Sequence, residues 1–167
     1  INIITKKGAA GFDVAVSGKY GSFNQNQEGV EVSGSSDALS FSITGEHTST
    51  DGYRDRSAFR SLAVGGNVGL DLDHLSTTLS FSYNRLFYEL PGTLTNAEFE
   101  ADPTQAQPGH DADESTGYYI NTDLSLAFSP SERATLEGNA GYRFRFIRSD
   151  IPSAFVSPFT DMKLHSV

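Results

Sequence analysis

Apolar and polar residues alternate with a period of two along most of the chain. The alternating segments begin near Phe12, Leu39, Leu62, Leu75, Tyr118 and Leu136. Because successive side chains of a β-strand point to opposite faces, each segment predicts a strand with one apolar and one polar face. A helix would need apolar residues at three- and four-residue spacing, which these segments lack.

The connections between these segments alternate in length. Tight turns are predicted at residues 34–37, 71–74 and 129–132, where turn-forming residues gather. Longer polar connections are predicted at residues 48–58, 89–116 and 149–160, and a shorter first hairpin at residues 22–28 falls at the same end. Short turns at one end and long loops at the other are typical of outer-membrane β-barrels, with the long loops outside the cell.

We therefore predict an all-β fold, an antiparallel transmembrane β-barrel, over a soluble antiparallel sandwich that would also alternate. Seven strands are clear and an eighth is expected at residues 161–167. Aromatic residues gather toward the long-loop ends, as in the girdle of a membrane interface: Tyr20, Phe23, Tyr83, Phe87, Tyr118, Tyr119, Phe144 and Phe146.

The predicted polar face is lined with small side chains, including Ser42, Ser80 and Ser125. A closed eight-stranded barrel must fill its interior with side chains, whereas small polar residues suit a wide lumen. These 7–8 strands are therefore expected to be a slice of a larger barrel. A small eight-stranded outer-membrane barrel with a structural or adhesive role and no transport is the alternative.

Composition excludes several classes of protein. The chain has 167 residues, with 12 basic and 21 acidic side chains and a net charge of −9, which argues against nucleic acid as a partner. It contains no cysteine, so disulfides and thiolate metal sites are excluded. It begins at Ile1 without an initiator Met or signal peptide, so an excerpt of a longer protein is expected.

Four short motifs resemble TonB-dependent outer-membrane receptors, which are transporters. Residues 1–8 (INIITKKG) resemble the end of their plug domain, and residues 21–24 (GSFN) follow at the first hairpin. Residues 49–57 (STDGYRDRS) resemble the family's second loop. Residues 90–95 (LPGTLT) and 99–106 (FEADPTQA) are similar to loops of members that import ferric siderophores or ferric citrate.

The resemblance implies a 22-stranded barrel in the cell outer membrane of a Gram-negative bacterium. Residues 1–7 would be the C-terminal strand of the plug domain and residues 8–167 the N-terminal part of the barrel. Such a protein binds a scarce nutrient, here an iron chelate, and imports it with energy from the inner-membrane TonB complex. The plug that would contact TonB, and with it the energy-coupling residues, is expected to lie almost entirely outside this sequence.

Two groups of basic residues are candidates for ligand binding. Arg143 and Arg145 share the polar parity of their strand near its loop end, where guanidinium groups could meet an anionic ligand or form a salt bridge to a neighbouring strand. In the second loop, Tyr53, Arg54 and Arg56 combine an aromatic ring with cations, which suits recognition or pinning of the loop. Arg85 and Arg148 have the apolar parity and are expected to reach lipopolysaccharide phosphates.

No catalytic constellation is predicted, so the chain is not expected to be an enzyme or to hold a cofactor. The four histidines are far apart in the sequence, and a Ser/His/Asp set can arise by chance among so many serines. The 89–116 connection contains seven carboxylates and no Lys or Arg, which could offer oxygen ligands to a divalent cation. Its spacing does not resemble an EF-hand, so a solvated acidic loop is the preferred interpretation and no metal site is predicted.

Overall fold

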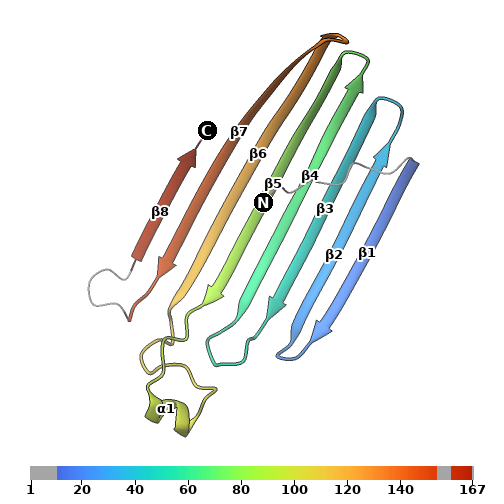
Figure 1. Ribbon diagram of the computed structural model, residues 1–167. Helices are drawn as coiled ribbons and strands as arrows, with labels where there is room; N and C mark the ends of the chain where they lie inside the picture. Colours follow the sequence, from blue (N-terminus) through green and yellow to red (C-terminus); the bar gives the residue numbers. More distant parts are fainter. Residues whose placement is uncertain (1–10, 154–158, 167) are drawn as a thin grey trace.

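The computed structural model describes residues 11–153 and 159–166, and folds them into one antiparallel sheet of 8 strands in chain order (Figure 1). The predicted strand at residues 1–7 lies outside the described residues. One short helix, α1 (Asn96–Ala101), lies between the fifth and sixth strands. The strands are β1 (Gly11–Gly21), β2 (Gln25–Ser35), β3 (Leu39–Thr50), β4 (Phe59–Leu72), β5 (Leu75–Glu89), β6 (Glu114–Ser131), β7 (Ala134–Asp150) and β8 (Phe159–Ser166).

The long connections and the short first hairpin lie at one end of the sheet and the other tight turns lie at the opposite end, as the sequence predicts. Residues 36–38, 73–74 and 132–133 form the turns at one end. The β1–β2 turn (22–24), the β3–β4 loop (51–58) and the β5–β6 loop (90–113) lie at the other end, where α1 is also found (Figure 1). We call these the turn end and the loop end.

The strand register separates the polar and apolar residues onto two faces. Ser42, Asn67 and Ser80 are direct partners across three adjacent strands, so their side chains share one face. The same alternation places Ser125 and Arg143 with them, which confirms the predicted polar set. Apolar residues of the alternating segments lie on the other face, as the period of two predicts: Phe41, Val64, Leu79, Leu126 and Phe144.

The sheet forms a single layer without a hydrophobic core. Among the described residues no apolar side chain is buried, and Leu79, in the middle of the apolar face, is 48% exposed. Globular domains normally cover the apolar face of a sheet with a second layer. Here nothing in the described chain covers it, and exposed apolar patches of this kind are typical of surfaces that contact another protein or a membrane.

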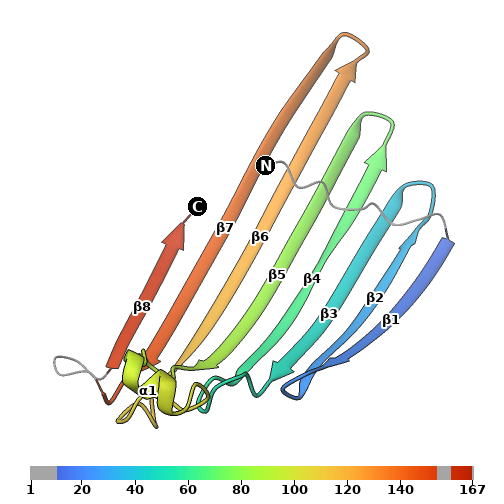
Figure 2. The same cartoon turned by 60° about the horizontal axis from the view of Figure 1, so that its bottom comes forward.

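β1 and β8 lie at opposite edges of this sheet and do not pair with each other (Figure 2). The structure therefore contains the antiparallel meander that the sequence predicts, as an open sheet. Among the described residues, none belongs to a helix long and apolar enough to span a bilayer.

Two features differ from the sequence-based expectation. β6 has 18 residues and β7 has 17, because their pairing continues through a register shift between Phe128 and Ser131, moving the turn to residues 132–133. This hairpin therefore rises above its neighbours at the turn end (Figure 2). The helix α1 was not predicted, although Thr95 and Glu98 form a capping box whose Thr-x-x-Glu spacing is visible in the sequence.

The glycine pair in β4 marks a close approach between strands. The sequence predicts a kink or a close backbone contact at Gly65–Gly66. A Cβ atom on Gly66 would lie 2.5 Å from the Ser42 carbonyl oxygen and 3.1 Å from the ring of Phe81, which is its direct partner on β5. The close-contact interpretation is confirmed, and it explains why no side chain fits there.

We expect Gly66→Ala to lower the free energy of unfolding by about 1–3 kcal/mol, because the methyl group forces the backbone of β3 and the ring of Phe81 to move. Gly138→Ala is the matched control, since its Cβ would meet nothing within 4 Å. Denaturant titrations followed by the circular dichroism of the sheet would measure both. Equal midpoints for the two variants would contradict the close contact.

Candidate ligand-binding site

Arg143 and Arg145 project from the polar face of β7. They are two positions apart on one strand, which separates their backbones by about 7 Å on the same side of the sheet. Arg145 precedes the last residue of β7, Asp150, by five positions. Both arginines therefore lie deeper in the sheet than the sequence analysis expects, about 17 Å from the loop end in the case of Arg145.

Arg143 is held by a carboxylate on the neighbouring strand. Its Nη2 atom lies 2.7 Å from Oδ1 of Asp123, and the two side chains are 41% and 44% exposed. This is the salt bridge to a neighbouring strand that the sequence offers as the alternative to ligand contact. Because exposed ion pairs contribute only about 0–1 kcal/mol, the guanidinium can exchange Asp123 for another anion at small cost.

Arg145 rests on an aromatic ring. Its guanidinium carbon lies 5.9 Å from the centre of the Tyr119 ring, its direct partner on β6. Tyr119 therefore belongs to the polar face, which corrects its placement in the aromatic girdle. The error arises because Tyr118 and Tyr119 are adjacent, so only one of them can face the apolar side. The ring leaves the donors of Arg145 available to a ligand.

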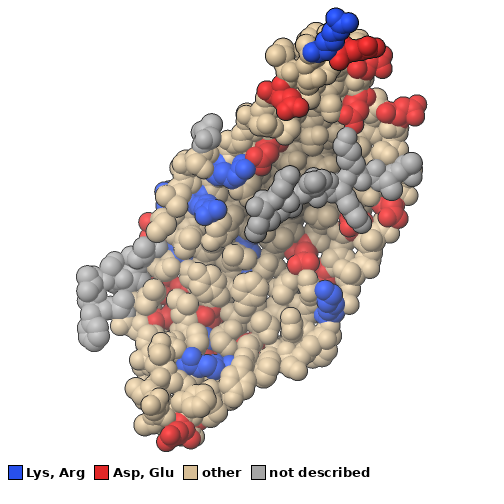
Figure 3. Space-filling model, viewed as in Figure 1, with Lys and Arg blue, Asp and Glu red and all other residues tan. Residues whose placement is uncertain are grey.

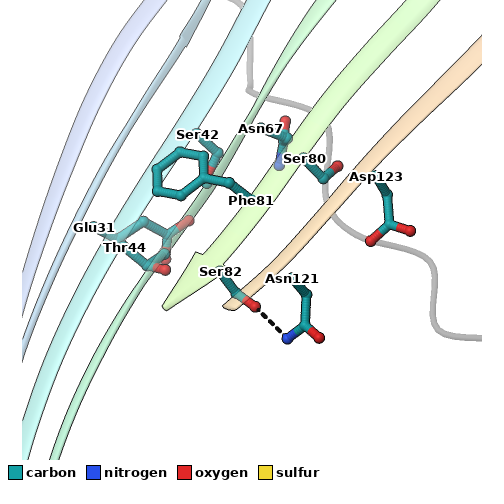
Figure 4. Close-up of a pocket in the computed structure, with 10 residues that line it drawn as sticks. Glu31, Ser42, Thr44, Asn67, Ser80, Phe81, Ser82, Asn121 and Asp123 are labelled. Carbon is teal, nitrogen blue, oxygen red and sulfur yellow. Dashed lines mark hydrogen bonds between the residues drawn. The ribbon is translucent and has the colours of Figure 1, made fainter. Parts of the chain in front are cut away.

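A hollow of about 470 Å³ lies beside Asp123, as Figure 4 shows. Inside it, Nδ2 of Asn121 donates to Oγ of Ser82 at 2.9 Å. Asp123 also lines a second hollow of about 330 Å³ that includes Arg143. Eight of the ten residues that line the first hollow carry a hydroxyl, amide or carboxylate group: Glu31, Ser42, Thr44, Gly66, Asn67, Ser80, Phe81, Ser82, Asn121 and Asp123.

Charged side chains of both signs are scattered over the face of the molecule in Figure 3, without a single large basic area. The net charge of −9 agrees with this distribution. An anionic ligand would therefore depend on individual arginines rather than on a general positive field.

Tyr53 packs against the first turn at the loop end. Its ring meets the ring of Phe23 edge to face, with centroids 5.6 Å apart. Phe23 has a φ of 58°, which is uncommon for a bulky side chain. Its carbonyl oxygen accepts hydrogen bonds from the Asp51 amide at 2.9 Å and the Thr50 hydroxyl at 3.0 Å. These contacts fix the β3–β4 loop on the β1–β2 turn, although 54% of Tyr53 remains exposed.

Arg54 joins the β3–β4 loop to the β5–β6 loop. All three guanidinium nitrogens donate to backbone carbonyls: Nε to Gln105 at 3.0 Å, Nη1 to Gly92 at 2.8 Å and Nη2 to Pro91 at 3.1 Å. The loop-pinning role that the sequence left open is therefore present for this residue. We call this set of contacts the Arg54 clamp.

Arg56 forms an ion pair between the β3–β4 loop and the last residue of β5. Its Nη1 lies 2.6 Å from Oε1 of Glu89, and Oε2 of Glu89 accepts the amide of Ala58 at 3.3 Å. Arg56 has a φ of 58°, so the local backbone is left-handed at this position. Nε of Arg56 is buried without a hydrogen-bond partner among the described residues. Its polar contacts stabilise the loop rather than face a ligand.

Carboxylates of the β5–β6 loop are engaged in local hydrogen bonds. Backbone and side-chain hydrogen bonds from Thr95 lower the pKa of Glu98, and hydrogen bonds from the Thr104 side chain and backbone lower the pKa of Asp102. No group of three or more possible metal ligands occurs in the described part of the chain. The loop is thus an ordered acidic segment held by its own hydrogen bonds.

A cluster of His110, Asp113 and Ser153 links the β5–β6 loop to the segment after β7. Nδ1 of His110 lies 2.7 Å from Oδ2 of Asp113 and 3.2 Å from Oγ of Ser153, whose hydroxyl donates to the same carboxylate oxygen. The Ser153 amide donates to Oδ1 of Asp113 at 3.2 Å. A catalytic triad uses the two opposite nitrogens of the imidazole, so this arrangement on one nitrogen does not match it.

Burial raises the pKa of Asp113, which is only 1% exposed, but hydrogen bonds from the Ser153 side chain and backbone and from His110 outweigh it, so the pKa is lowered. Sequence reasoning missed this cluster, since Ser153 is 40 positions from Asp113 and no motif joins them. Sequence reasoning also missed Asp123 as the partner of Arg143. The available signal was that both residues have the polar parity of their strands and so lie on the same face.

A comparison with models of known protein families finds no match to this sequence.

We expect Arg54→Met to increase cleavage of the β5–β6 loop by a glutamate-specific protease at Glu98 or Glu100 by at least about tenfold. Three hydrogen bonds from a charged donor are lost, each contributing about 1.5–3 kcal/mol in favourable cases. Arg133→Met, in the β6–β7 turn, removes the same charge from the opposite end and should leave the rate unchanged. Identical rates for both variants would show that the clamp does not hold the loop.

Acid should open the Asp113 cluster. Because the folded pKa is lowered, the stabilisation is fully present above the ordinary value of 3.8 and is lost as the pH falls through the folded pKa. The rate of amide hydrogen exchange at residues 110–113, corrected for the pH dependence of intrinsic exchange, should increase only below pH 3.8. Asp113→Asn should exchange fast at every pH, and a parent loop that stays protected in strong acid would contradict this role.

Proposed function

We propose that this chain is part of a TonB-dependent outer-membrane transporter that binds and imports a scarce nutrient, a ferric siderophore or ferric citrate complex. In this proposal residues 1–7 end the plug domain and residues 8–167 form the first strands of a barrel of 22 strands. The family resemblance of the four sequence motifs supports the choice of transporter.

The observation that carries the proposal is the open, single-layered meander with one predominantly apolar, exposed face. Its register places apolar side chains of all the central strands on that face. Strands of 11 to 18 residues in β1 to β7 are long enough to cross a bilayer, which needs about 9–11 residues per tilted strand. Lipid would cover the apolar face, and the polar face would line the lumen of the barrel.

The ordered loop end also supports this assignment. In the proposed orientation, the β3–β4 and β5–β6 loops are extracellular and the turn end is periplasmic. The ligand would rest on the polar face, where Arg143 exchanges Asp123 for an anionic group of the ferric complex and Arg145 donates from its place over Tyr119. Tyr53 is the exposed loop residue that could contact the ligand, whereas Arg54 and Arg56 hold the loops in place.

The small eight-stranded barrel is the weaker alternative. It needs β1 to pair with β8, whereas these strands are the two edges of the open sheet. It also needs an interior filled with side chains, and the polar face instead presents serines and the hollow beside Asp123.

The proposal is tested by ferric-complex uptake in cells that produce the full parent protein from its own reading frame. Radioactive ferric citrate and ferric siderophores should bind to the outer-membrane fraction and enter the cells only when TonB is present. Arg143→Ala/Arg145→Ala should weaken binding by about 1.5–3 kcal/mol for each charge-assisted hydrogen bond lost. Arg133→Ala, at the turn end, is the control and should bind as the parent does.

The possible outcomes separate the two assignments. A parent protein that inserts in the outer membrane but takes up no ferric complex would favour the small structural barrel. A protein found outside the membrane would reject both. If the double variant binds every ferric complex as tightly as the parent, the transporter can stand but the two arginines are structural.

A further inference from the structure

The positive charges of the apolar face are confined to two neighbouring rows near the loop end. One row of directly paired residues contains His47, Leu62, Arg85, Tyr118, Phe146 and Lys163. The next row toward the loops contains Ser49, Arg60, Phe87, Thr116, Arg148 and Asp161. We call these two rows the basic–aromatic belt. Every Lys and Arg on the apolar face of the described strands lies in it.

Three cations of the belt lie over aromatic rings of the adjacent strand. The guanidinium carbons of Arg60 and Arg85 lie 5.7 Å from the ring centres of Phe87 and Tyr118, respectively. Nζ of Lys163 lies 5.6 Å from the ring centre of Phe146. The rings hold the charged groups close to the sheet surface, yet an aromatic face leaves their hydrogen-bond donors unused.

These three cations have no carboxylate partner among the described residues. Arg148 differs, since its Nε lies 4.0 Å from Oδ1 of Asp161. Other acidic groups border the belt: Glu28 is opposite His47, and Glu89, Glu114 and Asp150 form the row beyond it at the loop end. Glu89 is already paired with Arg56. The unpaired positive charge is therefore concentrated on Arg60, Arg85 and Lys163.

Two of these cations share a cleft. A hollow of about 490 Å³ on this face is lined by His47, Arg60, Ser61, Leu62, Arg85 and Phe87. Leu62 pairs with His47 on one side and with Arg85 on the other. The floor of the cleft is therefore apolar, with the His47 imidazole and the Arg85 guanidinium on either side of it. Toward the turn end the floor continues into the apolar face through Val64 and Val68, and Val68 is 46% exposed.

We propose that the cleft between His47, Arg60 and Arg85 binds the phosphate group of a membrane lipid whose acyl chains lie along the apolar face. Guanidinium groups match the geometry of phosphate oxygens and can donate in pairs. The apolar floor beside them requires a ligand that is anionic at one end and apolar at the other. This inference rests on the proposed function, because it assumes that the apolar face lies in the outer membrane.

The test uses the full parent protein purified in nonionic detergent, with native mass spectrometry as the readout. The probe is a doubly phosphorylated, acylated disaccharide lipid of the lipid A type, compared with its enzymatically dephosphorylated form and with inorganic phosphate. The parent should retain the phosphorylated lipid in preference to both. Arg60→Gln/Arg85→Gln should raise its dissociation constant at least about tenfold, as expected when charge-assisted hydrogen bonds are removed.

Lys19→Gln/Arg133→Gln removes the same charge from outside the belt and should bind the lipid as the parent does. The inference is overturned if the dephosphorylated lipid binds equally well, if inorganic phosphate binds as tightly as the lipid, or if the belt variant keeps the parent affinity. Ferric-complex uptake by cells with the belt variant is measured in parallel. Lost lipid binding with intact uptake supports the site, whereas absent uptake in the parent itself counts against the proposed function only.

Discussion

Backbone hydrogen bonding between neighbouring strands carries this structure, since no described apolar side chain is buried. In a globular domain, removing apolar side chains from water supplies the main favourable free energy of folding. Here the same side chains remain on one open face, so their burial must come from the surroundings. The two faces therefore favour different surroundings, because apolar side chains gain free energy when they leave water and polar side chains do not. This division supports the proposed placement in a membrane.

The connections at the loop end are joined to one another by side-chain contacts, in addition to the pairing of the strands. Phe23 and Tyr53 join the β1–β2 turn to the β3–β4 loop, and the Arg54 clamp joins that loop to the β5–β6 loop. The cluster around Asp113 extends the chain of contacts to Ser153 after β7. Four connections distant in sequence are therefore coupled, and a ligand that displaced one of them would disturb its neighbour.

Much of this fold could be predicted from the sequence, because period-two alternation and turn residues are local signals. The strand faces around Ser42 and Phe41 and the lengths of the connections follow directly from them. The partners of the candidate residues could not be predicted, since they depend on register between strands. Asp123 beside Arg143 and Tyr119 beneath Arg145 are examples. The loop contacts of Arg54 also join distant segments, and only the helix start at Thr95 had a recognisable local signal.

The acceptors of the Arg54 clamp are all main-chain carbonyl oxygens, of Gln105, Gly92 and Pro91. Every amino acid supplies such an oxygen, so the clamp places few demands on which side chains the β5–β6 loop carries. Substitutions can therefore accumulate at the exposed positions of this loop while its attachment to the β3–β4 loop is kept. Evolution can in this way change the side chains presented at the loop end while the contacts that attach the β5–β6 loop are retained.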